Sequence, residues 1–109
     1  MKKLIILSLL LFTSFKTLAI NVIDIAVPDE FVTTMEVTDE YPLVKTGYLT
    51  QSISSITDFY QQQLGDPLKI TGSENYRTLY YNYQNRKVRI SLYHRNYVTE
   101  VSIMIEKIL

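Results

Sequence analysis

Apolar residues in the middle of the chain recur at the spacing of an amphipathic helix. The positions, each three or four residues from a neighbour, are Ile53, Ile56, Phe59, Tyr60 and Leu64. Ser52 precedes them and is suited to cap the free N–H groups of a first helical turn. Gly65 and Pro67 follow them, and these are residue types at which helices end. The pattern therefore predicts a single helix from about Ser52 to Leu64.

After this helix the pattern changes to alternation, which is typical of β-strands. Val88, Ile90 and Leu92 fall on one face of such a strand. The expected strands are Leu68–Thr71, Tyr76–Gln84, Lys87–His94 and Tyr97–Ile108. Asn85-Arg86 and Arg95-Asn96 are candidate two-residue hairpin turns, because Asn tolerates positive φ.

The chain before the helix has a weaker pattern. Ile20–Glu40 is expected to be an extended N-terminal segment, within which Phe31–Thr38 can form a strand because it is rich in β-branched residues. Leu43–Gln51 looks extended, with Gly47 as a possible bulge. Strand-like apolar residues also occur at Val22, Ile23, Ile25 and Val27.

These elements predict an α+β fold in two layers, with one helix packed on a four- to five-stranded antiparallel sheet. Residues 20–109 would form a single small domain, since about ninety residues build only one limited core.

The sheet face turned away from the helix would be polar and would carry aromatic side chains. Tyr80, Arg89, Tyr93 and Glu100 are its candidate partner-binding residues. One interpretation is a solvated face held by cross-strand pairs. The other is a recognition surface, since Tyr and Arg are enriched among residues that dominate binding energy.

The first nineteen residues have the organisation of a secretory signal peptide. Lys2 and Lys3 precede the apolar run Leu4–Phe12, and small residues precede a predicted cleavage after Ala19. The alternative is an uncleaved membrane anchor, although the run is shorter than a membrane span requires. Cleavage predicts a periplasmic or secreted protein, with no membrane span remaining.

Removal of this segment makes the chain acidic. Three of the eleven Lys and Arg residues leave with it, so eight face eleven Asp and Glu, a net charge of about −3. Ile20–Asp66 contains eight acids and one base, whereas the rest contains seven bases and three acids. The two halves either complement each other in the fold or form an acidic and a basic surface. Because there is no cysteine, no disulfide contributes to stability.

Motifs for catalysis and for cofactor or metal binding are absent from the sequence. His94 is the only histidine, and a lone histidine beside a turn is more often structural than catalytic. No spacing predicts a zinc site, an EF-hand, a Gly-x-Ser-x-Gly elbow or a phosphate-binding glycine loop. Tyr76–Tyr83 and the bases that follow it resemble single-strand binders, but an acidic exported chain argues against nucleic acid. We therefore expect no enzyme activity, no cofactor and no metal.

A looser pattern links several of these features. Tyr41-Pro42, the Ser52-capped helix with Phe59-Tyr60, and Leu64-Gly65 are followed by strands. In this respect Tyr41–Ile105 resembles small exported bacterial α+β domains of unknown function. The resemblance implies an α+β fold with a structural helix, and it implies no catalytic residues.

Three functions follow as hypotheses. The first is a non-catalytic binding or accessory module, inhibitor-like or immunity-like, whose partner is another exported or envelope protein. The second is a carrier of a small molecule or lipid, with a pocket between helix and sheet. The third is a small hydrolase that uses carboxylates or His94.

Overall fold

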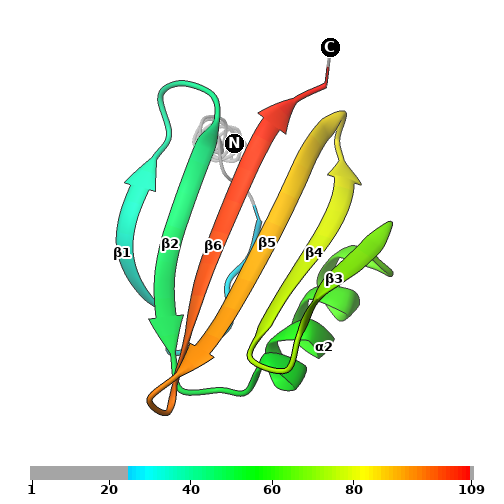
Figure 1. Ribbon diagram of the computed structural model, residues 1–109. Coiled ribbons are helices and arrows are strands. Elements are labelled where there is room, and N and C mark those ends of the chain that lie inside the picture. Colours follow the sequence, from blue (N-terminus) through cyan, green and yellow to red (C-terminus); the bar gives the residue numbers. More distant parts are fainter. Residues whose placement is uncertain (1–24, 109) are drawn as a thin grey trace, which may run out of the picture.

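The computed structural model describes residues 25–108, which form one antiparallel sheet with a helix on one side (Figure 1). The predicted signal peptide, together with Val22 and Ile23, lies outside the described residues. The elements are β1 (Val32–Val37), β2 (Leu43–Leu49), α2 (Ile53–Leu64), β3 (Lys69–Ser73), β4 (Tyr76–Tyr83), β5 (Arg86–Arg95) and β6 (Val98–Lys107).

The order of strands across the sheet is β1-β2-β6-β5-β4-β3. β3 to β6 form a meander of neighbouring strands, and its last strand returns to pair with β2. The helix lies in the connection between β2 and β3, which occupy distant places in the sheet. The fold is α+β, as predicted, but the sheet has six strands where four to five were expected. The additional strand is β1, which the weak N-terminal pattern offered only as a possibility.

The helix has the predicted bounds and caps. The Ser52 hydroxyl accepts a hydrogen bond from the Ser55 N–H at 3.1 Å, and the Gly65 N–H donates to the Gln61 carbonyl at 2.9 Å. Ile53, Ile56 and Tyr60 are buried against the sheet. Phe59 and Leu64 are only partly buried beside this core.

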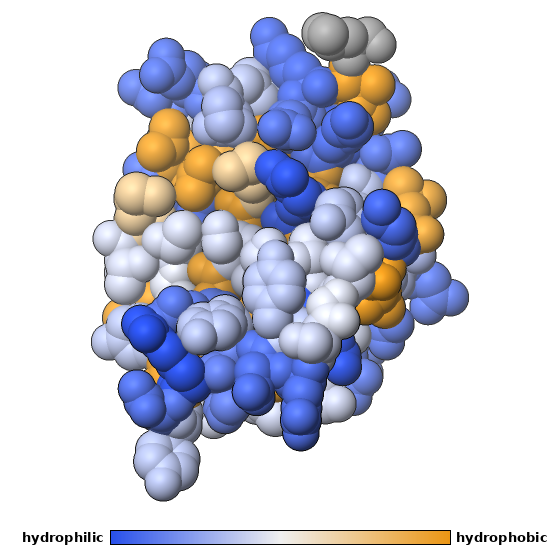
Figure 2. Space-filling model, viewed as in Figure 1, coloured by the Kyte–Doolittle hydropathy of each residue, from blue (hydrophilic) through white to orange (hydrophobic). Residues whose placement is uncertain are grey.

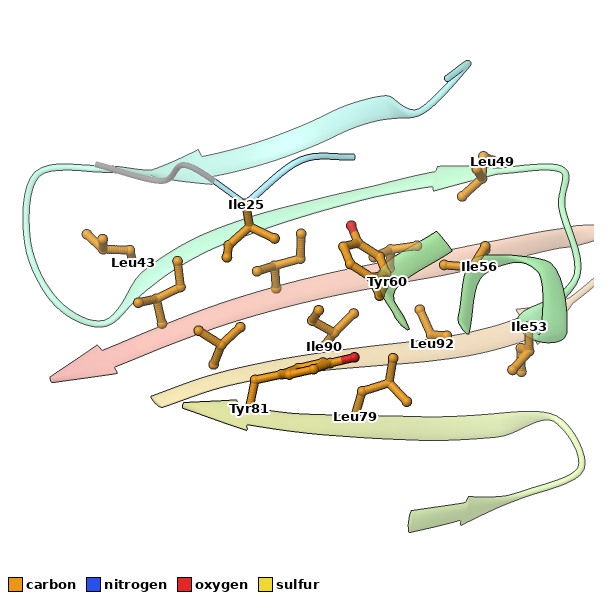
Figure 3. Packing of buried hydrophobic residues seen from close by; sticks show 14 residues of the cluster. Ile25, Leu43, Leu49, Ile53, Ile56, Tyr60, Leu79, Tyr81, Ile90 and Leu92 are labelled. Atoms are coloured by element: carbon orange, nitrogen blue, oxygen red, sulfur yellow. The ribbon is translucent and has the colours of Figure 1, made fainter. Parts of the chain in front are cut away.

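The core lies between the sheet and a second layer formed by α2 and residues 25–31 (Figure 3). The sheet contributes alternate residues of its four central strands, which are Leu43, Leu49, Leu79, Tyr81, Val88, Ile90, Leu92, Val101, Ile103 and Ile105. Ile25 is buried among them, and the Tyr60 hydroxyl donates to the Ala26 carbonyl at 2.9 Å. Ile25 is thus a core residue of an irregular segment and Val27 packs partly buried against the core, whereas their pattern suggested a strand.

Both predicted hairpin turns are displaced by one residue. The turn residues are Gln84-Asn85 and Asn96-Tyr97, and each has positive φ, which is the signature of a type I′ turn. The inner-face pairs decide this position, since Tyr81 lies opposite Val88 and Leu92 opposite Val101.

Gly47 is not a bulge. It pairs regularly with Thr33 and Val101, and the bulge instead occurs on β1 at Thr34. A Cβ at Gly47 would fall on the Phe31 ring and on the Val32 carbonyl oxygen. The glycine is therefore required so that Phe31 can lie on the inner face of β2.

A candidate recognition surface on the open sheet face

The structure brings the four predicted site residues together on the sheet face opposite α2, here called the open face. Tyr80 of β4 lies opposite Arg89 of β5, and Tyr93 of β5 lies opposite Glu100 of β6. The two pairs are separated along β5 only by Ser91, whose side chain shares their face. Alternation within each strand was sufficient to predict this grouping.

A row of hydroxyl side chains crosses the middle of the open face at right angles to the strands. The paired residues that form this hydroxyl row are Thr46, Ser102, Ser91, Thr78 and Thr71, on β2, β6, β5, β4 and β3. Thr34 of β1 extends the row, since its hydroxyl is 2.8 Å from that of Thr46. These side chains are short, so they form the floor of a trough between taller neighbours.

One wall of the trough is formed by tyrosines. Tyr48, Tyr93 and Tyr76 lie in the adjacent row, with Glu100 between the first two. Their exposed fractions are 40%, 43% and 43%, and the Tyr76 hydroxyl accepts a hydrogen bond from the Thr78 hydroxyl at 3.0 Å. Between Tyr48 and Tyr93 the trough has a volume of about 400 Å³, over Thr46, Ser91 and Ser102.

The opposite wall combines aromatic, sulfur and cationic groups. Its residues on the central strands are Met104, Arg89 and Tyr80. The Arg89 guanidinium lies 2.9 Å from the Met104 sulfur, and Lys69 lies 4.9 Å above the Tyr80 ring. Figure 2 shows the pale colours of mildly polar side chains across the middle of this face, with strongly hydrophilic blue groups on either side.

Ion pairs on the open face are solvent-exposed. Arg95 binds Glu100 at 3.1 Å and lies 5.8 Å from the centre of the Tyr93 ring. Arg89 lies 3.9 Å from Glu106. Since these side chains are 44–58% exposed, each pair adds less than about 1 kcal/mol to stability.

Tyr48 and Tyr76 also belong to this surface, although the sequence pattern did not predict them there. Tyr76 lies four residues before Tyr80 in the same strand, so the alternation of side chains alone could have placed both on one face. Tyr48 could not be placed, because the pairing of β2 with β6 joins residues some fifty positions apart in the chain.

His94 lies on the inner side of the sheet, at its end. The Thr99 hydroxyl donates to the Gln51 carbonyl at 2.6 Å and is 2.8 Å from His94 Nδ1. Because the hydroxyl has only one proton, we assign Nδ1 as the donor to Thr99. This chain of bonds ties β5 and β6 to the segment that enters α2, which is a structural role.

Two buried tyrosines on the inner side have perturbed acidity. Burial raises the pKa of Tyr60 well above its ordinary value. The pKa of Tyr81 is raised by burial and, to a lesser degree, by the negative charge of Asp66. The Tyr81 hydroxyl donates to the Gly65 carbonyl at 2.9 Å, so both phenols have structural partners.

Within residues 25–108, no group of three or more His, Asp and Glu side chains converges in a way that could hold a metal ion. The described part of the chain also has no helix with the length and apolar character needed to cross a membrane.

No protein-family model matches this chain, and neither the curated proteins nor the solved structures include a significant match.

Proposed function

We propose that this protein is a non-catalytic binding or accessory module, inhibitor-like or immunity-like, that engages another exported or envelope protein through the open face. One observation carries the proposal: Tyr48, Tyr93 and Tyr76 stand in a row, 40–43% exposed, on a sheet face that no other described element covers. Tyrosine gives a large contact area for a small loss of rotamer freedom, which is why it is enriched at interfaces.

The character of the face favours a separable partner. Its centre is polar, whereas permanent interfaces resemble a protein core. The sheet holds the three tyrosines on β2, β5 and β4, so little ordering is needed on binding. The trough of about 400 Å³ can accept a protruding side chain or loop of the partner.

Export is part of the same proposal. The organisation of Met1–Ala19 supports a signal peptide with cleavage before Ile20, which would deliver the domain to the periplasm or to the medium. The partner would then be met outside the cytoplasm.

The packing of the two layers supports a binding module more than a carrier. Ile56 and Tyr60 of the helix and Leu79, Ile90 and Ile103 of the sheet have 0% exposure and belong to one cluster (Figure 3). A carrier needs an internal pocket, whereas these side chains fill the space in which one would lie. The hydrolase hypothesis gains no support from His94, whose Nδ1 takes part with Thr99 in the link between β5, β6 and the segment that enters α2.

The proposal is tested by affinity capture from periplasmic extract with three baits. The wild-type protein and the Tyr97→Ser variant should retain the same partner, because Tyr97 lies in the β5–β6 turn and is 88% exposed. The triple variant Tyr48→Ser, Tyr76→Ser, Tyr93→Ser should lose it. Circular dichroism would show that all three baits are folded. Equal retention by the triple variant would overturn the proposal.

A further inference from the structure

A second hollow on the open face differs from the trough in its charge. It has a volume of about 400 Å³ and lies where β3, β4, β5 and β6 cross the face towards the C-terminal end of β6. Three cations line it, namely Lys69, Lys87 and Arg89, and Glu106 is the one carboxylate. We call it the cationic hollow.

The charges of the hollow are poorly compensated. Glu106 lies opposite Lys87 in the sheet register, yet its carboxylate is 3.9 Å from Arg89. Lys69 faces the Tyr80 ring. Neither Lys69 nor Lys87 forms an ion pair within the part of the chain that the structure describes. Three positive charges therefore share one exposed negative charge.

We propose that the cationic hollow binds carboxylate side chains on an acidic surface of the partner protein. The inference rests on the proposed function, since it names the chemistry by which the open face selects its partner. An Asp or Glu of the partner would replace Glu106 as the carboxylate beside Arg89 and would also pair with Lys87. Tyr80 and the 70% exposed Leu68 would supply apolar contact beside it.

The composition of the hollow favours protein carboxylates over other anions. Nucleic-acid binding is associated with a strongly basic domain, whereas this chain has a pI of about 6.6. Juxtamembrane recognition of anionic lipid uses clusters of four to eight basic residues, more than the three found here. Aromatic residues and Arg are instead enriched at protein interfaces, and Tyr80 and Arg89 both line the hollow.

The test is an NMR titration of the exported protein, purified from the periplasm of an expression host, with end-capped tetraglutamate as the probe. We expect the largest amide shifts at Lys69, Lys87 and Arg89. Lys87→Gln should weaken the apparent affinity about two- to fivefold, the range for one exposed ion pair. Glu106→Gln should strengthen it by a similar factor, because the competing carboxylate is gone.

Arg95→Gln is the matched control, since it removes one positive charge from the far end of the same face. It should leave the affinity for tetraglutamate nearly unchanged. Equal weakening by Arg95→Gln and Lys87→Gln would overturn the inference, because it would show an effect of net charge alone. Failure of Glu106→Gln to strengthen binding would do the same.

Two parallel titrations separate the sources of negative charge. Inorganic phosphate and vesicles of anionic phospholipid should give weaker shifts than tetraglutamate at the hollow. Preferential binding of either would overturn the choice of a protein partner. The titration needs no natural partner, so its failure is distinguishable from failure of the affinity capture, which tests the open face as a whole.

Discussion

At the scale of single residues, the two sides of the sheet use tyrosine differently. Tyr60 and Tyr81 are buried on the inner side, and their hydroxyls bind backbone carbonyls of Ala26 and Gly65. Tyr93 and Tyr48 on the open face keep two-fifths of their surface exposed. The same side chain therefore packs in the core on one side and is exposed on the other, where we propose that it contacts a partner.

The first prediction separates these uses with one type of substitution. Tyr60→Phe should lower the free energy of unfolding by about 1 kcal/mol, because the hydrogen bond from its hydroxyl to the Ala26 carbonyl is lost. Tyr93→Phe should change it by less than about 0.5 kcal/mol, as expected of an exposed position. Urea unfolding of both variants measures the difference. Equal effects would contradict the structural role of the Tyr60 hydroxyl.

The second prediction concerns alkaline pH. In the unfolded chain the Tyr60 hydroxyl loses its proton near pH 10. In the folded protein burial raises the pKa of Tyr60, so the hydroxyl stays protonated at higher pH. The contribution of the Tyr60 hydroxyl to the free energy of unfolding is therefore fully present below pH 10. It falls as the pH rises further, by up to about 1.4 kcal/mol per pH unit. Tyr60→Phe should lose stability less steeply above pH 10 than wild type does, as measured by urea unfolding at several pH values. Parallel curves would contradict the assignment.

At the scale of elements, local signals determined the helix. The N-cap residue, the stripe of apolar residues and the glycine that ends the helix lie within fourteen residues. The helix bounds predicted from them agree with those of α2. The hairpin turns were harder to predict. Asn85 and Asn96 suit turns, but the apolar pairs across the strands fix the turn centres one residue from the positions expected.

The third prediction tests the cap of α2. Ser52→Ala should lower the free energy of unfolding by about 1 kcal/mol, because the Ser55 N–H loses its acceptor. Ser54→Ala is the matched control. Ser54 is an exposed position inside the helix, where Ala is the better helix former, so this change should be neutral or slightly stabilising. Thermal unfolding followed by circular dichroism compares the two, and a similar loss in both variants would contradict the capping role.

At the scale of the whole molecule, the pairing of β2 with β6 creates the open face. This contact joins residues 43–49 to residues 99–105 and places Tyr48 beside Glu100, which in turn lies beside Tyr93. Alternation predicted that Tyr80, Arg89, Tyr93 and Glu100 share a face, because each lies in a meander of neighbouring strands. It could not predict the full tyrosine row or the sixth strand, since no local pattern specifies which distant strands pair.

The central claim, that the open face is the recognition surface, is tested most directly by photo-crosslinking in the periplasm. A benzophenone amino acid replaces either Tyr93 on the open face or Asp58, an exposed residue of α2 on the other side of the sheet. We predict a light-dependent covalent adduct with a single partner protein from position 93 and none from position 58. Adducts from position 58 alone, or equally from both positions, would contradict the account.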